Sequence, residues 1–250
     1  MKYNNLEIFR CKLQKKKLCK GMLISMTDPI VSEIAGELGF DFTWIDTEHN
    51  MLNPETVMRH IMAARGSECA PLVRVQWSEW GVIKPVLDAA PAGVIIPMIN
   101  SAAEAAEAIS CCKYPPRGKR GFGIKRCSCY GNIKFTDYLK QAESEPMVIL
   151  QIEHISVLKE LDQILQLPGI DSICIGPADL SGSMGKPCAY DDPEVKRVLD
   201  EISAKVKKAG LYLGTAESLT EDWKARNVDW IACASDCGSL ISGAKFELSK

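Results

Sequence analysis

Short apolar runs alternate with amphipathic segments along most of the chain, so that strand-like and helix-like patterns take turns. The apolar runs predict eight strands, at 21–26, 42–46, 71–76, 93–97, 147–151, 171–175, 211–214 and 229–232. The amphipathic segments predict helices at 5–19, 29–38, 53–65, 77–90, 101–110, 133–143, 155–166, 193–209, 217–227 and 236–247.

This alternation favours a parallel sheet, because each strand is followed by a helix that returns the chain in a right-handed crossover. Eight such units predict an α/β fold of the closed (β/α)8 or TIM-barrel type, with an extra helix at the N-terminus. No linker or low-complexity stretch interrupts the chain, so we expect residues 1–250 to form a single domain. In such barrels the chemistry lies at the carboxyl ends of the strands.

Composition and charge narrow the possible partners. The chain is 46% hydrophobic and 25% charged, with a net charge of -2, which provides no basic field for nucleic acid or a membrane. Lys12, the run Lys15–Lys17 and Lys20 are interpreted as a solvated helix face rather than a polybasic anchor. The polar N-terminus is unlike a signal peptide, and no apolar run is long enough for a transmembrane helix, so we expect a cytoplasmic protein.

Eleven cysteines occur, and their spacing does not form the paired C-x-x-C pattern of a zinc site. In the cytosol they are expected to be thiols, most of them small buried apolar groups. Cys127 and Cys129 stand in a polar loop and are candidates for reactive thiols, although no base is evident for them.

Two carboxylates follow neighbouring predicted strands. Glu153 ends the run 148–153, and Asp179 follows the run 173–175. Glu153 alone would suit an ion pair equally well, and Asp179 alone a helix cap. Together they favour a divalent cation held by oxygen ligands, Mg²⁺ or Mn²⁺ rather than zinc or copper, with an open shell that substrate can enter. Gln151 lies two residues before Glu153 and therefore faces the same side of the strand.

Other polar groups fall at the same predicted rim. His49 follows Asp46 and Glu48, so that a carboxylate can orient its ring, which makes it a candidate general acid or base. Arg74 ends an apolar strand and is a candidate for an anionic substrate or a developing oxyanion. The segment 176–181, which includes Ala178, can offer backbone N–H groups to a carboxylate, or it is only a tight turn.

The remaining polar features carry weaker signals. His60 is predicted to lie on a helix surface, and His154 to point away from the side that Glu153 faces. The Gly-, Pro- and Arg-rich segment 114–123 lacks the pattern of a phosphate-binding loop and is interpreted as a loop that covers substrate.

The motifs together resemble the HpcH/HpaI aldolase family, the metal-dependent class II pyruvate aldolases, whose wider relatives include citrate lyase β-like proteins. The similarity covers most of the chain, in family order, and is loose at the N-terminal helix and after Gly214. The matching segments are GFDFTWIDTEHN (39–50), PLVRVQ (71–76), GVIIPMINSAAEAAEAI (93–109), YPPRGKRGFG (114–123), VILQIEH (148–154) and PGIDSICIGPADLSGSMGKP (168–187).

The resemblance implies a barrel that assembles as a hexamer, a trimer of dimers in which paired subunits exchange the last helix. It also implies residue roles. Glu153 and Asp179 would hold Mg²⁺, Mn²⁺ or Co²⁺, while Arg74, Gln151, Ala178 and Asp179 would contact the substrate. His49 would be the catalytic histidine, with Arg74 at the enolate oxygen and with Asp46 and Asp88 as acids of its network, Asp88 reaching it from a neighbouring subunit.

The implied reaction is a retro-aldol cleavage. A 4-hydroxy-2-keto acid would be cleaved to pyruvate and an aldehyde through a metal-stabilised enolate, with His49 taking the proton of the 4-hydroxyl group. Two alternatives stay open: a citrate-synthase-like enzyme that forms a carbon–carbon bond on oxaloacetate, and a non-catalytic barrel. The loop 46–50 departs from the Gly-Glu-His sequence of many relatives, and 124–132 does not match them, so the resemblance does not name the aldehyde.

Overall fold

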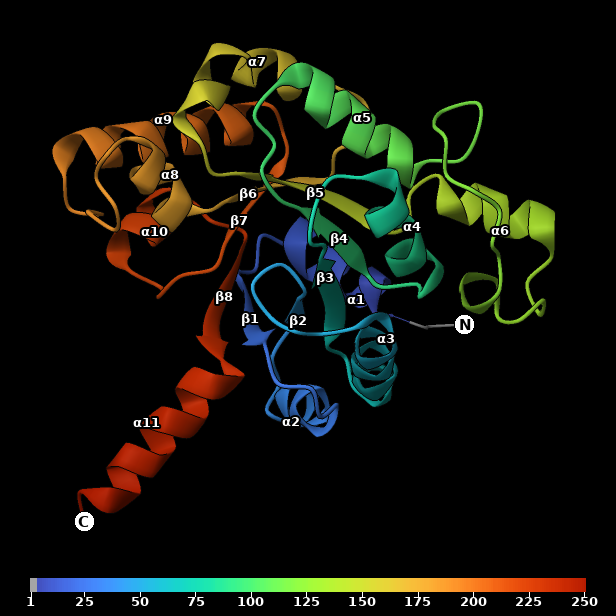
Figure 1. Ribbon diagram of the computed structural model, residues 1–250, viewed down its shortest axis with the longest axis horizontal. Helices are drawn as coiled ribbons and strands as arrows, with labels where there is room; N and C mark the ends of the chain where they lie inside the picture. The colour runs from blue at the N-terminus through green and yellow to red at the C-terminus, as the bar shows by residue number, and fades with distance from the viewer. Residues whose placement is uncertain (1–3) are drawn as a thin grey trace.

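The computed structural model describes residues 4–250 and shows eight parallel strands closed into a barrel (Figure 1). Each strand pairs with the next one along the chain, and β8 returns to pair with β1. The predicted (β/α)8 barrel is therefore confirmed. The strands are β1 (Cys19–Ile24), β2 (Phe42–Asp46), β3 (Ala70–Arg74), β4 (Gly93–Ile96), β5 (Met147–Ile152), β6 (Ser172–Ile175), β7 (Tyr212–Thr215) and β8 (Trp230–Ser235).

Helices surround the barrel, and most of them match the amphipathic segments predicted from the sequence. The α-helices are α1 (Leu6–Gln14), α2 (Ile30–Glu37), α3 (Pro54–Ala63), α4 (Trp80–Asp88), α5 (Ala102–Cys112), α6 (Phe135–Ala142), α7 (Leu161–Ile164), α8 (Pro177–Ser183), α9 (Pro193–Lys208), α10 (Glu221–Ala225) and α11 (Asp236–Leu248). Three short 3-10 helices complete the set: η1 (Ala64–Gly66), η2 (Arg126–Ser128) and η3 (Ile155–Lys159).

Two predicted helices differ from those observed. The segment 155–166 is split into η3 and α7 at Glu160, whose backbone is not helical and whose carboxylate accepts a hydrogen bond from the Ala102 N–H at 2.8 Å. The N-terminal helix ends at Gln14 rather than at residue 19, and Lys16 has a left-handed backbone conformation with φ of 54°. The Glu160 carboxylate thus binds a free backbone N–H at the start of α5, and Lys16, in its left-handed conformation, ends α1.

Aromatic side chains fill the end of the barrel at which the strands begin. Phe42 contacts Phe9 of α1 and Trp230 of β8, with ring centroids 5.6 and 5.4 Å apart, and Trp44 lies 6.0 Å from Trp230. The Trp230 indole donates to the Ser172 hydroxyl at 2.9 Å, so its buried N–H is satisfied. The extra N-terminal helix therefore closes one end of the barrel and leaves the other end for chemistry.

A second apolar layer lies between the strands and the surrounding helices. It contains the buried aliphatic faces of α4, α5, α7, α9 and the outward sides of β4 to β7. These helices consequently fix the strand ends that they follow. Within residues 4–250, no helix is both long enough and apolar enough to cross a bilayer.

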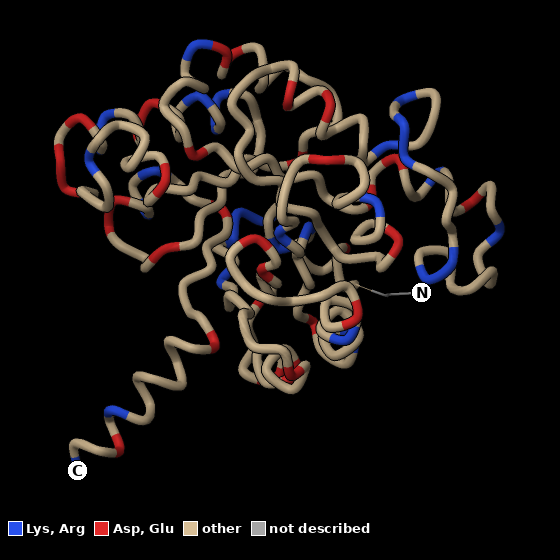
Figure 2. The backbone as a smooth tube through the Cα atoms, viewed as in Figure 1, with Lys and Arg blue, Asp and Glu red and all other residues tan. Residues whose placement is uncertain are grey.

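The last helix, α11, leaves the barrel and extends away from it (Figure 1). Its side chains Leu240, Ile241, Phe246 and Leu248 are 64%, 54%, 62% and 88% exposed. Few charges interrupt this helix, whereas acidic and basic residues are interspersed over the rest of the chain (Figure 2). Exposed apolar side chains grouped on one helix mark an interaction surface.

Two sequence-based expectations about surface groups are wrong. His60 is fully buried. Both ring nitrogens have a partner there: Nδ1 lies 2.8 Å from the Ser32 hydroxyl oxygen, and Nε2 lies 3.0 Å from the Met26 carbonyl oxygen. Cys127 and Cys129 are also buried, so neither has the exposure that a reactive thiol needs. No disulfide joins any of the cysteines of residues 4–250.

Candidate functional site

The polar residues predicted to meet at one rim come from β2, β3, β5 and the start of α8. Asp46 and Arg74 end β2 and β3 and are register partners across the two strands. Gln151 is next to last in β5, and Glu153 follows that strand directly. Because all strands are parallel, these residues lie at the same end of the barrel.

Arg74 is the best-held charge of this rim. It is only 7% exposed, its Nε donates to Asp46 Oδ1 at 2.7 Å, and its Nη1 lies 2.9 Å from Glu48 Oε2. The Trp44 ring centroid lies 5.1 Å from its guanidinium carbon. Although burial disfavours its charge, the bond to Asp46 and the nearby carboxylates raise the pKa of Arg74. Arg74 therefore presents a permanent positive charge with a fixed orientation.

Asp46 organises the loop that follows β2. Its Oδ2 accepts a hydrogen bond from Asn50 Nδ2 at 2.7 Å, and its Oδ1 accepts one from the Glu48 N–H at 3.2 Å. The Thr47 hydroxyl donates to the Arg74 carbonyl oxygen at 2.6 Å, which ties the same loop to β3. Asp46 thus orients both the loop and Arg74, rather than contacting His49 directly.

Glu48 is a functional candidate that the sequence suggested only as a carboxylate near His49, not as a site residue. Burial raises the pKa of its carboxyl to about 7, against the opposing charge of Arg74 and with the charge of Glu153 adding to the effect. Its Oε2 lies 3.7 Å from His49 Nε2, and the His49 side chain is 63% exposed. Glu48 therefore connects the buried Arg74 to the exposed histidine.

Glu153 is a buried carboxylate with few compensating charges. It is 2% exposed, Oε1 accepts a hydrogen bond from the Met98 N–H at 2.7 Å, and Oε2 accepts one from Gln151 Nε2. Burial raises the pKa of Glu153, and the charge of Asp179 raises it further. A Cβ at Gly176 would lie 2.6 Å from Glu153 Oε2, so only glycine lets the backbone approach this closely.

The donor atoms fit a divalent cation. Two carboxylates, Glu153 and Asp179, influence each other electrostatically, and the buried Gln151 Oε1 has no hydrogen-bond partner in the part of the chain that the structure describes. All three are hard oxygen donors. Within residues 4–250, no cluster of three or more His, Cys, Asp or Glu side chains is arranged to hold a metal.

Three of the predicted residues lie in the first turn of α8 and at the end of α4. Ala178 and Asp179 are exposed in the first turn of α8, next to Gly176. Asp88 ends α4, where its Oδ1 lies 3.6 Å from Arg120 Nη2 and where a Cβ at Gly123 would approach its Oδ2 to 2.7 Å. Within one chain, therefore, the structure does not bring Asp88 to His49.

The contribution of Met98 was missed in the sequence analysis. Its backbone N–H binds Glu153, and its φ of 56° is left-handed, which is uncommon for a residue other than glycine. No side-chain pattern could have revealed a backbone donor. Glu48 could have been found, because it lies in the same polar cluster as Asp46 and His49.

The loop 114–123, interpreted as a cover for substrate, packs beside α4 instead. The Arg120 guanidinium is buried, donates to the Leu87 carbonyl oxygen at 3.1 Å and lies 4.6 Å from the centre of the Tyr114 ring. Phe122 stacks on Tyr114 with ring centroids 4.9 Å apart. These contacts give the loop a structural role at the end of α4 within its own chain.

Comparison with known proteins gives consistent matches over nearly the whole chain. A hydroxypyruvate/pyruvate aldolase of Agrobacterium fabrum is 36% identical over 78% of this chain and 73% of its own. A solved HpcH/HpaI aldolase/citrate lyase family protein of Burkholderia cenocepacia superposes with a TM-score of 0.89 at 26% identity, covering 97% of this chain and 98% of that one.

A second solved structure, the citrate synthase SbnG, has a TM-score of 0.86 at 28% identity, covering 96% of this chain and 95% of the other. The model of the HpcH/HpaI aldolase/citrate lyase family matches residues 20–242, which include every residue of the rim described above. The chain therefore belongs to the HpcH/HpaI aldolase/citrate lyase family.

Proposed function

We propose that this protein is a class II aldolase, a carbon–carbon lyase that cleaves a 4-hydroxy-2-keto acid to pyruvate and an aldehyde and also catalyses the reverse addition. The observation that carries the proposal is a buried Arg74, fixed by two carboxylates, beside an oxygen-donor set at the same rim. The similarity to a protein named as a hydroxypyruvate/pyruvate aldolase supports pyruvate as one product.

Glu153 and Asp179 are the proposed metal ligands, and the chemistry of their oxygens suits Mg²⁺ or Mn²⁺, with Co²⁺ as a third option. A divalent ion held there would supply a Lewis acid for the carboxylate and keto oxygens of the substrate. Gln151 and the backbone around Ala178 complete the binding site for this half of the molecule.

Arg74 and His49 carry the proton and charge chemistry in this proposal. His49 removes the proton of the 4-hydroxyl group, the C3–C4 bond breaks, and the electron pair passes to the enolate of pyruvate. The Arg74 guanidinium stabilises the enolate oxygen, because its position is fixed before the charge develops. Glu48 stabilises the protonated His49, while Asp46 holds Arg74 in place. Protonation of C3 then gives pyruvate.

The test of function is turnover. The purified protein with added Mn²⁺ is incubated with a panel of 4-hydroxy-2-keto acids, and pyruvate release is followed with a coupled dehydrogenase. We expect cleavage that EDTA abolishes and that added metal restores. Pyruvate release that persists at full rate in EDTA, or no release from any member of the panel, contradicts the proposal.

The site assignment has its own test. Calorimetric titration of metal-free protein with Mn²⁺ should show an affinity at least about 100-fold weaker in Glu153→Gln and in Asp179→Asn, because loss of even an outer partner costs about 10- to 100-fold. Glu143→Gln, on the exposed end of α6, is the control and should bind normally. Normal affinity in both site variants contradicts the assignment.

A citrate-synthase activity is the second candidate, because the solved citrate synthase shares the fold and 28% of its sequence with this chain. Arg74 could stabilise the enolate in that reaction as well. Coenzyme A release from acetyl-CoA in the presence of oxaloacetate distinguishes the two candidates. We rank it second because the sequence contains no recognisable CoA-binding signature.

We also propose that residues 1–250 form one domain and that subunits pair by exchanging α11, with three pairs forming a hexamer. The exposed apolar side chains of α11 support this pairing, because contact with water is unfavourable for them and a partner subunit would bury them. In such an assembly Asp88 would reach His49 of a neighbour. We expect Leu240→Ser/Phe246→Ser to give smaller particles by light scattering, whereas Lys245→Ala should not.

We propose a cytoplasmic location, where the cysteines would stay reduced.

A further inference from the structure

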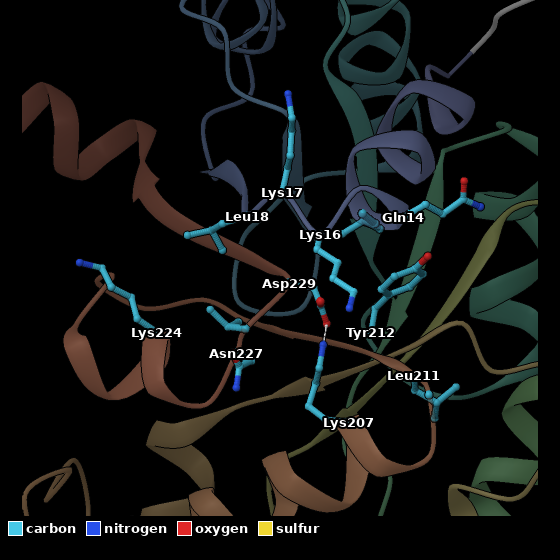
Figure 3. A pocket seen from close by; sticks show the side chains of 13 residues that line it. Gln14, Lys16, Lys17, Leu18, Lys207, Leu211, Tyr212, Lys224, Asn227 and Asp229 are labelled. Carbon is cyan, nitrogen blue, oxygen red and sulfur yellow. Dashed lines mark hydrogen bonds and ion pairs between the residues drawn. The ribbon is translucent and has the colours of Figure 1, made fainter.

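A hollow opens at the end of the barrel opposite the candidate site. Its volume is about 740 Å³, and it lies where β1, β7 and β8 begin (Figure 3). None of its lining residues belongs to the site proposed for the aldolase chemistry. The lining residues are Leu13, Gln14, Lys16, Lys17, Leu18, Lys207, Gly210, Leu211, Tyr212, Lys224, Asn227, Val228 and Asp229.

The charge of this hollow is unlike that of the whole protein. Four lysines line it and one aspartate, whereas the whole chain has a net charge of -2. Asp229 Oδ2 already accepts bonds from Lys207 Nζ at 2.5 Å and from the Leu213 N–H at 2.7 Å. The single acid is therefore committed to one lysine and one backbone group.

Lys16 has an unfavourable backbone conformation for a lysine and, among the residues that the structure describes, no ion-pair partner that would account for its charge. The stretch Lys15–Lys17 was interpreted as part of a solvated helix face, but α1 ends at Gln14 and Lys16 has a left-handed backbone with φ of 54°. Glycine is the usual residue at such a helix end, because it adopts this conformation without strain. Within residues 4–250 the Lys16 ammonium makes no ion pair, and Figure 3 shows its side chain extending toward Asp229 and Tyr212.

The rest of the lining supplies neutral donors and an apolar wall. Tyr212 lies at the start of β7, and burial raises the pKa of its phenol, so it stays a hydrogen-bond donor near neutral pH. Asn227 lies on the same side as Lys224, at the end of α10 (Figure 3). Leu211 and other aliphatic residues form the wall.

We propose that this hollow binds a small organic or inorganic anion of at least two negative charges, such as a phosphate ester or a polycarboxylate, with Lys16 and Lys207 as its central cationic contacts. Lys17 and Lys224 also line the hollow, but their ammonium groups point away from its centre in Figure 3, so they are not counted among the direct contacts. The volume suits a small molecule, since ligand pockets commonly span about 300–1,000 Å³. The site does not depend on the proposed aldolase activity.

Calorimetric titration with pyrophosphate and with citrate, at constant ionic strength and without added metal, tests the proposal. We expect at least one of the two to bind saturably, and the tighter ligand assigns the phosphate or the carboxylate class. Lys16→Gly should weaken that binding about tenfold or more while leaving the protein folded, because glycine suits the left-handed conformation. Lys15→Gly, which removes an adjacent lysine outside the lining, is the matched control and should change the affinity less than twofold.

Two further arms locate the bound anion. The tighter ligand should protect Lys16, but not the exposed Lys208, from acetylation with acetic anhydride followed by mass spectrometry. Arg74→Lys, which alters the cation of the other rim, should leave the affinity unchanged. Binding by neither anion, equal losses in the Lys16 and Lys15 variants, or a loss confined to the Arg74 variant each overturns the proposal.

Discussion

Replacing Arg74 by methionine tests whether the rim is held together by its buried ion pairs. The change keeps most of the side-chain volume but removes the charge between Asp46 and Glu48, which lie 2.7 and 2.9 Å from it. Asp46 is 1% exposed and would be left without a cation. Breaking a buried pair on one side costs about 3–5 kcal/mol, because the remaining charge stays desolvated. We expect Arg74→Met to lower the free energy of unfolding by that amount.

The assay is urea denaturation followed by circular dichroism, at one fixed protein concentration because the proposed assembly would contribute to apparent stability. Arg59→Met is the control: Arg59 pairs with Glu55 one helical turn away, and their side chains are 61% and 73% exposed. An exposed pair of this kind contributes about 0.3–0.5 kcal/mol. The double variant Arg74→Met/Asp46→Asn should recover part of the loss, since it removes the stranded charge.

A loss below about 1 kcal/mol in Arg74→Met, or no recovery in the double variant, would refute the reasoning. The first result would mean that Asp46 is solvated on losing its partner. The second would mean that the loss arises from packing against Trp44 rather than from charge.

Three further predictions concern packing, pH and the start of the last helix. Gly214→Ala places a Cβ 1.9 Å from the Trp230 ring and should cost about 1–3 kcal/mol in urea denaturation, whereas Gly182→Ala, with open space around it, should not destabilise. For metal-free protein, the raised pKa of Glu48 means that the folded state binds this proton more tightly. Stability should therefore fall from about pH 4.5 to 7, with Glu48 contributing up to about 3 kcal/mol. By urea titration at each pH the fall should be smaller in Glu48→Gln, where the raised pKa of Glu153 still contributes. Asp236→Ala removes the acceptor of two backbone N–H groups after β1 and should cost about 2 kcal/mol or more, seen as faster hydrogen exchange there.

The barrel could be predicted from the sequence because its signal is repeated. Every strand is a short apolar run and every crossover is amphipathic, so single errors at boundaries do not change the topology. The boundaries themselves depend on pairing. β1 was predicted at 21–26 but is observed at Cys19–Ile24, since its pairing with β8 begins at Cys19 opposite Trp230. Apolar pattern alone cannot show which residues a neighbouring strand will pair with.

The candidate site was predictable to the extent that strand ends meet at one rim. Which groups touch there was not predictable, because contacts depend on register and on side-chain direction. The contact of Glu48 with Arg74 and the hydrogen bond from the Met98 N–H to Glu153 form only in the folded chain, and no spacing in the sequence predicts them. His60 was misplaced for the same reason: its buried ring donates from Nε2 to the Met26 carbonyl oxygen and accepts at Nδ1 from the Ser32 hydroxyl, and the sequence spacing shows neither partner.

The closure of the barrel has a consequence for synthesis of the protein. The pairing of β1 with β8 joins Cys19 to Trp230, so the ring cannot close until nearly the whole chain has left the ribosome. Until then the growing sheet has two open edges, and open strand edges invite pairing with other chains. A nascent chain arrested before β8 is therefore expected to need a chaperone.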